Sequence, residues 1–383
     1  MNNFLYITAD RINTQTGGGL VTFHESEALK SLGPCEIFDR DILARPGRTA
    51  FGEYDVWEEA LSAVAMGQTG PDSPWVDPWV WDGFACYRWR ELERDRQKYQ
   101  PPKFAHFYAG TFTTTIKKLK EIGCKVSYTA AAHNIELSKQ AHLEAGIPFD
   151  YPHLTDPELW KRYVGGYLAA DVVICPSTHS ADVMRSYGCK NVEIIPHGVD
   201  IPETIAPLPK TFTVGYMGSY GPDKNVPILL KAWKKLAYRD SLLVLAGRDS
   251  NSPYVQDMVA KHGGGNIVMA GWVDKVADFY NSISLYVQPS WTEGFGCEVL
   301  EAQAHGRAVL CSRGAGASDL VYEHEKFQPD DVDKLVDRIN KMKTNHDYNY
   351  LPSIGERNRE YSRLHEWDNI RRRYVELWRS LIR

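Results

Sequence analysis

The stretch VEIIPHGVDIPETIAPLPKTFTVGYMG, residues 192–218, decides how the chain is divided. It begins with a short apolar run that is typical of a buried strand. Segment 196–210 follows with four prolines, which interrupt regular structure and predict a linker. A second apolar run, 211–218, then restarts the strand pattern. The stretch therefore predicts two domains that meet near residue 200.

Short apolar runs alternate with segments of helical period on both sides of this linker. The expected strands are at 4–9, 35–40, 103–109, 125–132, 172–177, 192–198, 211–218, 241–247, 266–271, 285–290, 308–312 and 326–329. Alternating strands and helices are typical of parallel, doubly wound sheets. The expected fold class is therefore α/β, with two Rossmann-like domains in tandem and a cleft between them. We assign residues 1–200 to the first domain and 201–365 to the second.

Two further segments, the tail at 366–383 and residues 70–103, differ from this alternation of strands and helices. In the tail, apolar residues recur with a helical period at Trp367, Ile370, Tyr374, Leu377, Trp378 and Leu381. We expect a helix at 366–383 whose apolar face returns to the first domain. Residues 70–103 are rich in proline and tryptophan and predict an irregular insertion in the first domain. The tryptophans of this insertion either form a small core under a long loop, which we favour, or stack on an acceptor sugar.

Composition excludes several classes of function. The net charge of −5 does not favour nucleic-acid binding. No apolar run is long enough to cross a bilayer, and the N-terminus lacks the pattern of a secretion signal. Seven cysteines without a C-x-x-C pair suit a reducing compartment, so we expect a cytoplasmic protein. Lys117, Lys118, Lys120 and Lys125 allow peripheral contact with a membrane face at most, and a solvated helix face is favoured.

The candidate site is in PSWTEGFGCEVLEAQAHGRAVLCS, residues 289–312. Gly294 and Gly296 permit a tight turn and a close approach of the backbone to a ligand. A helix is expected from Cys297, and the free N–H groups at its start favour an anion such as phosphate.

Two carboxylates flank this predicted anion site. Glu293 precedes the turn and Glu301 lies on the helix. Ionised carboxylates only accept hydrogen bonds, so they repel phosphate and bind hydroxyl groups. A nucleotide sugar has phosphates in the middle and hydroxyl-rich rings at both ends, and it satisfies both requirements. The alternative is that the acids only favour the positive end of the helix dipole.

This stretch resembles the S-x-x-E-G-F-G-x-x-x-x-E-A block of the retaining glycosyltransferases of family four, which have the GT-B fold. TGGGL (16–20), PHGVD (196–200), VGYMGSYGPDKNVPILLKAWKKL (214–236) and EWDNIRRRYVELW (366–378) are similar to that family too. The resemblance implies retaining transfer of a sugar from a nucleotide sugar to a glycan or glycolipid acceptor, without a cofactor or a metal. Neither the nucleotide base, the sugar, the acceptor nor the oligomeric state can be inferred from the sequence.

The resemblance also implies roles for individual residues. Glu293, His133 and Lys224 are the expected catalytic residues. The expected donor-binding residues are Gly17, Gly18, Gly19, Ser219, Lys224, Arg248, Trp272, Glu293, Gly294, Phe295, Gly296, Cys297, Glu298 and Glu301. Glu293 holds the sugar, Glu301 the ribose and Lys224 the diphosphate in this scheme, and Gly17–Gly19 form a loop facing the donor.

The sequence departs from the family at three positions. Ser219 stands where the family usually has an arginine, so one phosphate-binding cation is missing or Arg248 supplies it. His197 replaces the asparagine of P-N-G-V-D. Asp319 replaces the acid of GG-x-x-E, in a segment that reads AGASD.

Other interpretations remain open. A glycosidase uses two carboxylates as acid and nucleophile or base. A nucleotide-sugar epimerase has the same fold, and a two-domain sugar-binding protein needs no catalysis. The acid pairs DRD (39–41) and DVD (331–333) resemble metal ligands, but we assign no metal to either, since the second starts a helix where acids are favoured.

Overall fold

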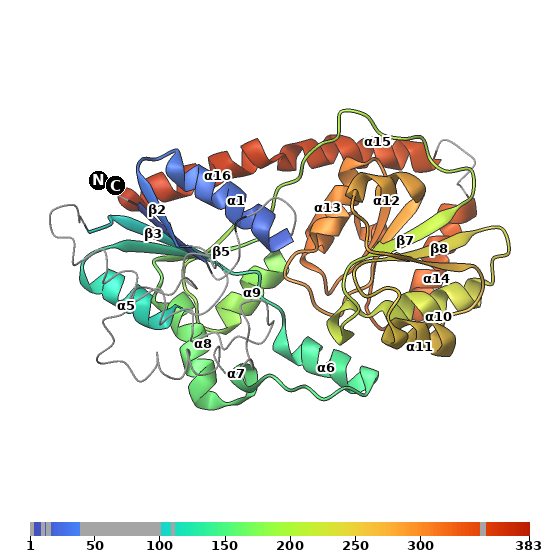
Figure 1. The fold of residues 1–383 in the computed structure, drawn as a ribbon, viewed down its shortest axis with the longest axis horizontal. Coiled ribbons are helices and arrows are strands. Elements are labelled where there is room, and N and C mark those ends of the chain that lie inside the picture. Colours follow the sequence, from blue (N-terminus) through green and yellow to red (C-terminus); the bar gives the residue numbers. More distant parts are fainter. Residues whose placement is uncertain (1–3, 9–11, 13–16, 39–100, 109–111, 345–349) are drawn as a thin grey trace.

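The chain folds into two lobes, each built on a parallel sheet (Figure 1). The computed structural model describes residues 4–8, 12, 17–38, 101–108, 112–344 and 350–383. Strand order is β2-β1-β3-β4-β5-β6 in the first sheet and β12-β11-β10-β7-β8-β9 in the second. Within the described residues, the twelve strands lie where the sequence predicts them, and their pairings are parallel.

The first sheet lies between two layers of helices. Its strands are β1 (Phe4–Thr8), β2 (Cys35–Phe38), β3 (Phe104–Tyr108), β4 (Lys125–Thr129), β5 (Val172–Cys175) and β6 (Val192–Ile194). The helices of this lobe are α1 (Gly17–Lys30), α5 (Thr113–Glu121), α6 (Ile135–Ala145), α7 (Pro152–Thr155), α8 (Pro157–Ala169) and α9 (Thr178–Ser186). Short β-branched and aromatic strands buried on both faces give this layered arrangement.

The second sheet repeats the pattern. Its strands are β7 (Thr213–Met217), β8 (Leu242–Ala246), β9 (Ile267–Gly271), β10 (Leu285–Gln288), β11 (Ala308–Ser312) and β12 (Lys326–Phe327). The α-helices are α10 (Val226–Leu236), α11 (Pro253–His262), α12 (Val276–Ser282), α13 (Cys297–Ala304), α14 (Val332–Thr344) and α15 (Tyr350–Ser362). Short 3-10 turns are η1 (Pro222–Lys224), η2 (Gly316–Leu320), η3 (Glu323–Glu325) and η4 (Arg363–His365).

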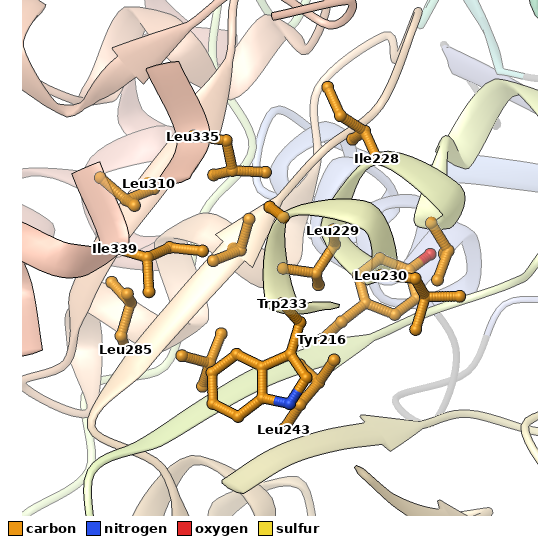
Figure 2. Close-up of a cluster of buried hydrophobic side chains, with 14 of the residues drawn as sticks. Tyr216, Ile228, Leu229, Leu230, Trp233, Leu243, Leu285, Leu310, Leu335 and Ile339 are labelled. Carbon is orange, nitrogen blue, oxygen red and sulfur yellow. The ribbon is translucent and has the colours of Figure 1, made fainter. Parts of the chain in front are cut away.

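One core of the second lobe packs α10 and α14 on the sheet. Leu229 and Trp233 of α10 meet Leu335 and Ile339 of α14 over the strands, and all four side chains are buried (Figure 2). Full burial of such side chains contributes about 1.5–3 kcal/mol each, so this lobe is a rigid base for the loops at its edge.

The last helix returns to the first lobe, as the sequence predicts. Helix α16 (Trp367–Ile382) runs beside α1 above the first sheet (Figure 1). Its buried residues Trp367, Ile370, Tyr374 and Trp378 share a core with Phe4 and Tyr6 of β1. The predicted apolar face of this helix is therefore buried in the first lobe.

The chain crosses between the lobes twice, and the two crossings contact each other. The backbone N–H of Val199 donates to the carbonyl of His365 at 2.9 Å, and Val199 forms a parallel bridge with Glu366. A Cβ on Gly198 would lie 2.4 Å from the ring of Trp367. Glycine is therefore required at position 198 for the crossings to pack this closely.

Two expectations need comment. Gly17–Gly19 are not a loop before the helix, because α1 begins at Gly17. Most of the insertion at 70–103, with Trp75, Trp79, Trp81 and Trp89, and the pair DRD (39–41) lie outside the described residues. Among the helices that the structure describes, none combines the length and apolar character of a membrane span.

Candidate functional site

The loop after β10 carries Glu293 and is held on both sides by backbone hydrogen bonds. The N–H of Glu293 donates to the carbonyl of Gly314 at 3.0 Å, and its carbonyl accepts from the N–H of Gly316 at 2.9 Å. A Cβ on Gly314 would lie 2.0 Å from the carbonyl oxygen of Trp291. The glycine after β11 therefore lets two loops lie side by side and fixes Glu293 at the carboxyl edge of the sheet.

Lys224 contacts Glu293 directly. It ends the turn η1 after β7, and its ammonium group forms an ion pair and hydrogen bond with the Glu293 carboxylate. Their side chains are only 19% and 13% exposed. Burial alone would lower the pKa of Lys224, but the carboxylates of Glu293 and Glu298 outweigh it and raise this pKa. The site thus holds a cation beside two acids.

Helix α13 starts within this cluster. Gly296, at φ 99°, turns the chain into the helix, which begins at Cys297. Burial raises the pKa of Glu298 on the first turn of the helix. Burial also raises the pKa of the neighbouring Cys297 thiol. The first-turn N–H groups of α13 therefore lie next to Lys224 and Glu293, where an anion is favoured.

Glu301 lies one turn further along α13. Burial and then the charge of Glu298 raise its pKa to about 7. Its carboxylate accepts a hydrogen bond from the hydroxyl of Tyr280 at 2.8 Å. The same hydroxyl lies 3.1 Å from the carbonyl oxygen of Glu298, so a buried tyrosine contacts this turn of the helix at two points.

His133 reaches the cluster from the first lobe. Its Nε2 is 3.9 Å from a Glu293 oxygen and its Nδ1 is 3.9 Å from Asp223. Burial alone would raise the pKa of Asp223, but the nearby imidazole of His133 and the hydrogen bond from Ser138 lower it. The structure therefore brings the three expected catalytic residues together and adds Asp223, which sequence reasoning missed although it precedes Lys224.

The lobes touch through a row of hydrogen bonds around the cluster. The N–H of Asn134 donates to Thr292 Oγ1 at 2.8 Å, and Ser138 Oγ donates to Asp223 at 2.7 Å. Ser177 Oγ donates to the carbonyl of Gly294 at 2.7 Å. A Cβ on Gly294 would lie 2.5 Å from the carbonyl of Ala131, so glycine lets the lobes meet here. The lobes are in direct contact at the Glu293 loop.

His179 and Thr292 are further residues that sequence reasoning missed. His179 Nε2 lies 3.2 Å from Thr292 Oγ1, and burial followed by the charge of His133 lowers the pKa of His179. Thr292 precedes Glu293 in the sequence, but neither His179 nor Thr292 lies in a sequence pattern that indicates a functional residue.

The remaining expected donor residues occupy other places. Ser219 is exposed after β7, and its carbonyl accepts a hydrogen bond from Tyr216. Arg248 follows β8 and Trp272 follows β9, and the guanidinium lies 5.6 Å from the centre of the Trp272 ring. The Phe295 ring packs edge-on against His197 at 5.0 Å and is buried. Gly17–Gly19 form the first turn of α1 in the other lobe.

The acid pair DVD is a helix start, as expected. Asp331 accepts from the N–H of Lys334 at 2.8 Å in the first turn of α14. Within the described ranges, no group of three or more His, Cys, Asp or Glu side chains is placed to hold a metal ion.

The second lobe matches a known family. Residues 211–345 match the family model described as "Glycosyl transferases group 1". This lobe is similar to the group 1 glycosyl transferases. The match contains Lys224, Glu293 and the start of α13, so the second-lobe part of the cluster lies within the matched residues.

Curated relatives include glycosyltransferases of several kinds. The chain is 25% identical over 259 residues to sulfoquinovosyl transferase SQD2 of Arabidopsis thaliana, covering 61% of this chain and 49% of that protein. It is 29% identical over 178 residues to a lipopolysaccharide 1,2-N-acetylglucosaminetransferase of Salmonella typhimurium, covering 42% and 46%. The chain thus spans about half the length of the curated relatives it matches.

Solved structures confirm the GT-B fold over the whole chain. Sucrose-phosphate synthase from Thermosynechococcus elongatus superposes with a TM-score of 0.74 at 17% identity, covering 99% of each chain. Anabaena HepE, solved in complex with UDP, superposes with a TM-score of 0.65 at 16% identity, covering 100% of each chain. The chain therefore has the two-lobed GT-B fold, and its second lobe matches the family model of the group 1 glycosyl transferases.

Proposed function

We propose that this chain transfers a sugar from a UDP- or GDP-sugar to a hydroxyl of a glycan or glycolipid. Transfer retains the anomeric configuration and requires neither a metal nor another cofactor. The observation that carries the proposal is the contact between Lys224 and Glu293 beside the first turn of α13, with Nε2 of His133 from the other lobe 3.9 Å from a Glu293 oxygen. This arrangement combines a phosphate-binding cation and helix N–H groups with acids suited to hydroxyls.

The departing diphosphate determines the electrostatics of the reaction. The bond between C1 of the sugar and the phosphate oxygen breaks, and its electron pair stays on the diphosphate. Lys224 and the first N–H groups of α13 are fixed beside the place where that negative charge grows, so they stabilise the transition state more than the ground state. Diphosphate binding then replaces Glu293 as the main partner of Lys224.

The acceptor attacks from the face that the diphosphate leaves. The acceptor oxygen bonds to C1, and its proton passes to the departing phosphate oxygen, so charge and protons balance without a protein nucleophile. Glu293, released from Lys224, accepts hydrogen bonds from sugar hydroxyls and orients the ring. Glu301 does the same for the ribose, and Tyr280 holds its carboxylate in place.

Contact between the lobes closes the cleft in which the sugar is transferred. Hydrogen bonds at Thr292, Gly294 and Asp223 close the first lobe onto the Glu293 loop. A closed cleft excludes water, which otherwise competes with the acceptor for the donor sugar. We place the enzyme in the cytoplasm, in the synthesis of a polysaccharide or glycoconjugate, with peripheral membrane contact at most.

A melting-temperature panel of UDP-, GDP- and ADP-sugars tests the proposal. A donor at about 100 times its Kd stabilises the folded state by about 2.7 kcal/mol, so one nucleotide class raises the Tm. That donor then releases its nucleotide slowly in water, and Glu293→Gln abolishes release while the Tm without ligand is kept. If no nucleotide sugar raises the Tm, the proposal is wrong. An isomerised sugar recovered without acceptor identifies an epimerase instead.

A further inference from the structure

The first lobe contains a pocket of about 490 Å³ whose lining includes none of the expected donor-binding residues. It lies among α6, α7, α8 and α9, and it falls within the range of about 300–1,000 Å³ that small-molecule sites occupy. Its walls combine the rings of Trp160 and Tyr187 with Glu136, Lys139 and Ser186.

Two contacts connect this pocket to the candidate site. Asn134 lines it, and the N–H of Asn134 donates to Thr292 Oγ1 in the second lobe. Tyr187 lines it too, and its hydroxyl lies 3.5 Å from the carbonyl of His133. The pocket therefore starts at the residues next to His133 and leads away from the cleft along α9.

The chemistry of the walls selects a class of ligand. Trp160 and Tyr187 meet edge to face, with ring centres 4.7 Å apart and planes at 88°, so each ring holds the other in place. The face of an aromatic ring is negative and attracts the C–H bonds on the flat side of a sugar ring. Glu136 and Lys139 pair at 2.8 Å, so the rim offers an acceptor and a donor with no excess charge. Such walls suit a neutral pyranose.

We propose that this pocket binds a neutral sugar unit of an oligosaccharide acceptor, one unit removed from the hydroxyl that reacts beside His133. The pocket as a sugar site stands by itself, while its assignment to the acceptor rests on the proposed function. An acceptor of at least two sugar units then occupies both the reaction site and this pocket, and a monosaccharide acceptor occupies only one of them.

Saturation-transfer NMR on the full chain tests the site. The probes are methyl glycosides of glucose, galactose, mannose, rhamnose and N-acetylglucosamine, and octyl β-glucoside, with the donor site filled by the nucleotide that raises the Tm. We expect saturation on the ring C–H protons of one or more glycosides. Trp160→Ala raises the Kd at least about fivefold, and Trp160→Phe, which keeps an aromatic face, restores most of the affinity.

Two more variants separate binding from folding. Ser186→Trp fills the pocket from an exposed position and also abolishes saturation. Tyr254→Ala removes a half-exposed aromatic from α11 in the second lobe and leaves saturation unchanged.

The opposite results overturn the inference. It is wrong if no glycoside is saturated, if the signal survives both Trp160→Ala and Ser186→Trp, or if saturation falls on the octyl chain instead of the ring, which marks a lipid site. If no nucleotide sugar binds at all but Trp160-dependent saturation is seen in the unliganded chain, the proposed function fails and the sugar site stands.

Discussion

The carboxylate of Asp319 accepts a hydrogen bond from the backbone N–H of Thr178 at 2.7 Å, across the boundary between the two lobes. Thr178 is the first residue of α9, where N–H groups lack partners within the helix. Asp319 lies in η2 of the second lobe, at the place of the family's GG-x-x-E acid. Asp319 therefore keeps a carboxylate at this position, and in this chain that carboxylate connects the two lobes.

Asp319→Ala should favour the open arrangement. A hydrogen bond to a charged group contributes about 1.5–3 kcal/mol, and its loss leaves the start of α9 without this partner. We expect a larger radius of gyration by small-angle scattering and a turnover reduced about tenfold. Asp182→Ala is the matched control, since Asp182 pairs with Arg185 on its own helix. Equal radii for wild type and Asp319→Ala would show that this contact does not hold the lobes together.

Lys224→Ala should remove the main cation of the site. Losing one group that stabilises developing charge costs about 10²–10³-fold in turnover. The variant also leaves Glu293 and Glu298 without a buried counter-charge, so nucleotide affinity falls with turnover. Lys261→Ala, on the exposed side of α11, is the control for loss of one positive charge. Steady-state kinetics of nucleotide release checks this, and a Lys224→Ala enzyme within threefold of wild type contradicts the role.

The strands and the tail helix could be predicted because their signals are local. A buried strand such as β8 needs only a short apolar run, and the period of Trp367, Ile370, Tyr374 and Trp378 extends over about three turns. Placing these strands in two parallel sheets follows from their alternation with helices. None of this requires knowledge of contacts between distant residues.

The candidate site was predictable only in part for the same reason. Glu293 and Glu301 lie in one segment, so their spacing carries a signal. Asp223, Thr292 and His179 act through contacts between lobes, and such contacts leave no pattern within a single segment. For Gly17–Gly19 the sequence pattern was misleading. Three glycines predict a loop, but helix α1 begins at Gly17.

Glu301→Gln should change how stability depends on pH. Burial and Glu298 raise the pKa of Glu301 from 4.5 to about 7, so the folded state favours the neutral acid. The group's contribution is fully present below pH 4.5 and is lost as the pH rises toward 7, by about 3 kcal/mol. Gln cannot ionise, so the variant should lose less stability over this range. Urea unfolding at intervals from pH 4.5 to 8 measures the difference, and parallel curves for the two proteins would refute it.

His197→Asn should change the stability of the protein at acid pH. His197 is buried against Phe295, and burial lowers its pKa from 6.5 to about 4. The folded state therefore keeps this ring neutral while the unfolded chain takes up a proton below pH 6.5. The stability contributed above pH 6.5 is lost as the pH falls toward 4, again by about 3 kcal/mol.

Asparagine, the usual residue of the family at this position, does not titrate, so His197→Asn should unfold at a lower pH than the wild type. Acid titration followed by tryptophan fluorescence gives the two midpoints. His262→Asn is the control, since His262 is at the end of α11 and far less buried. An acid midpoint for His197→Asn equal to that of wild type would mean that other groups set the acid limit. A shift confined to His197→Asn would identify the lobe junction as the acid-sensitive part of the fold.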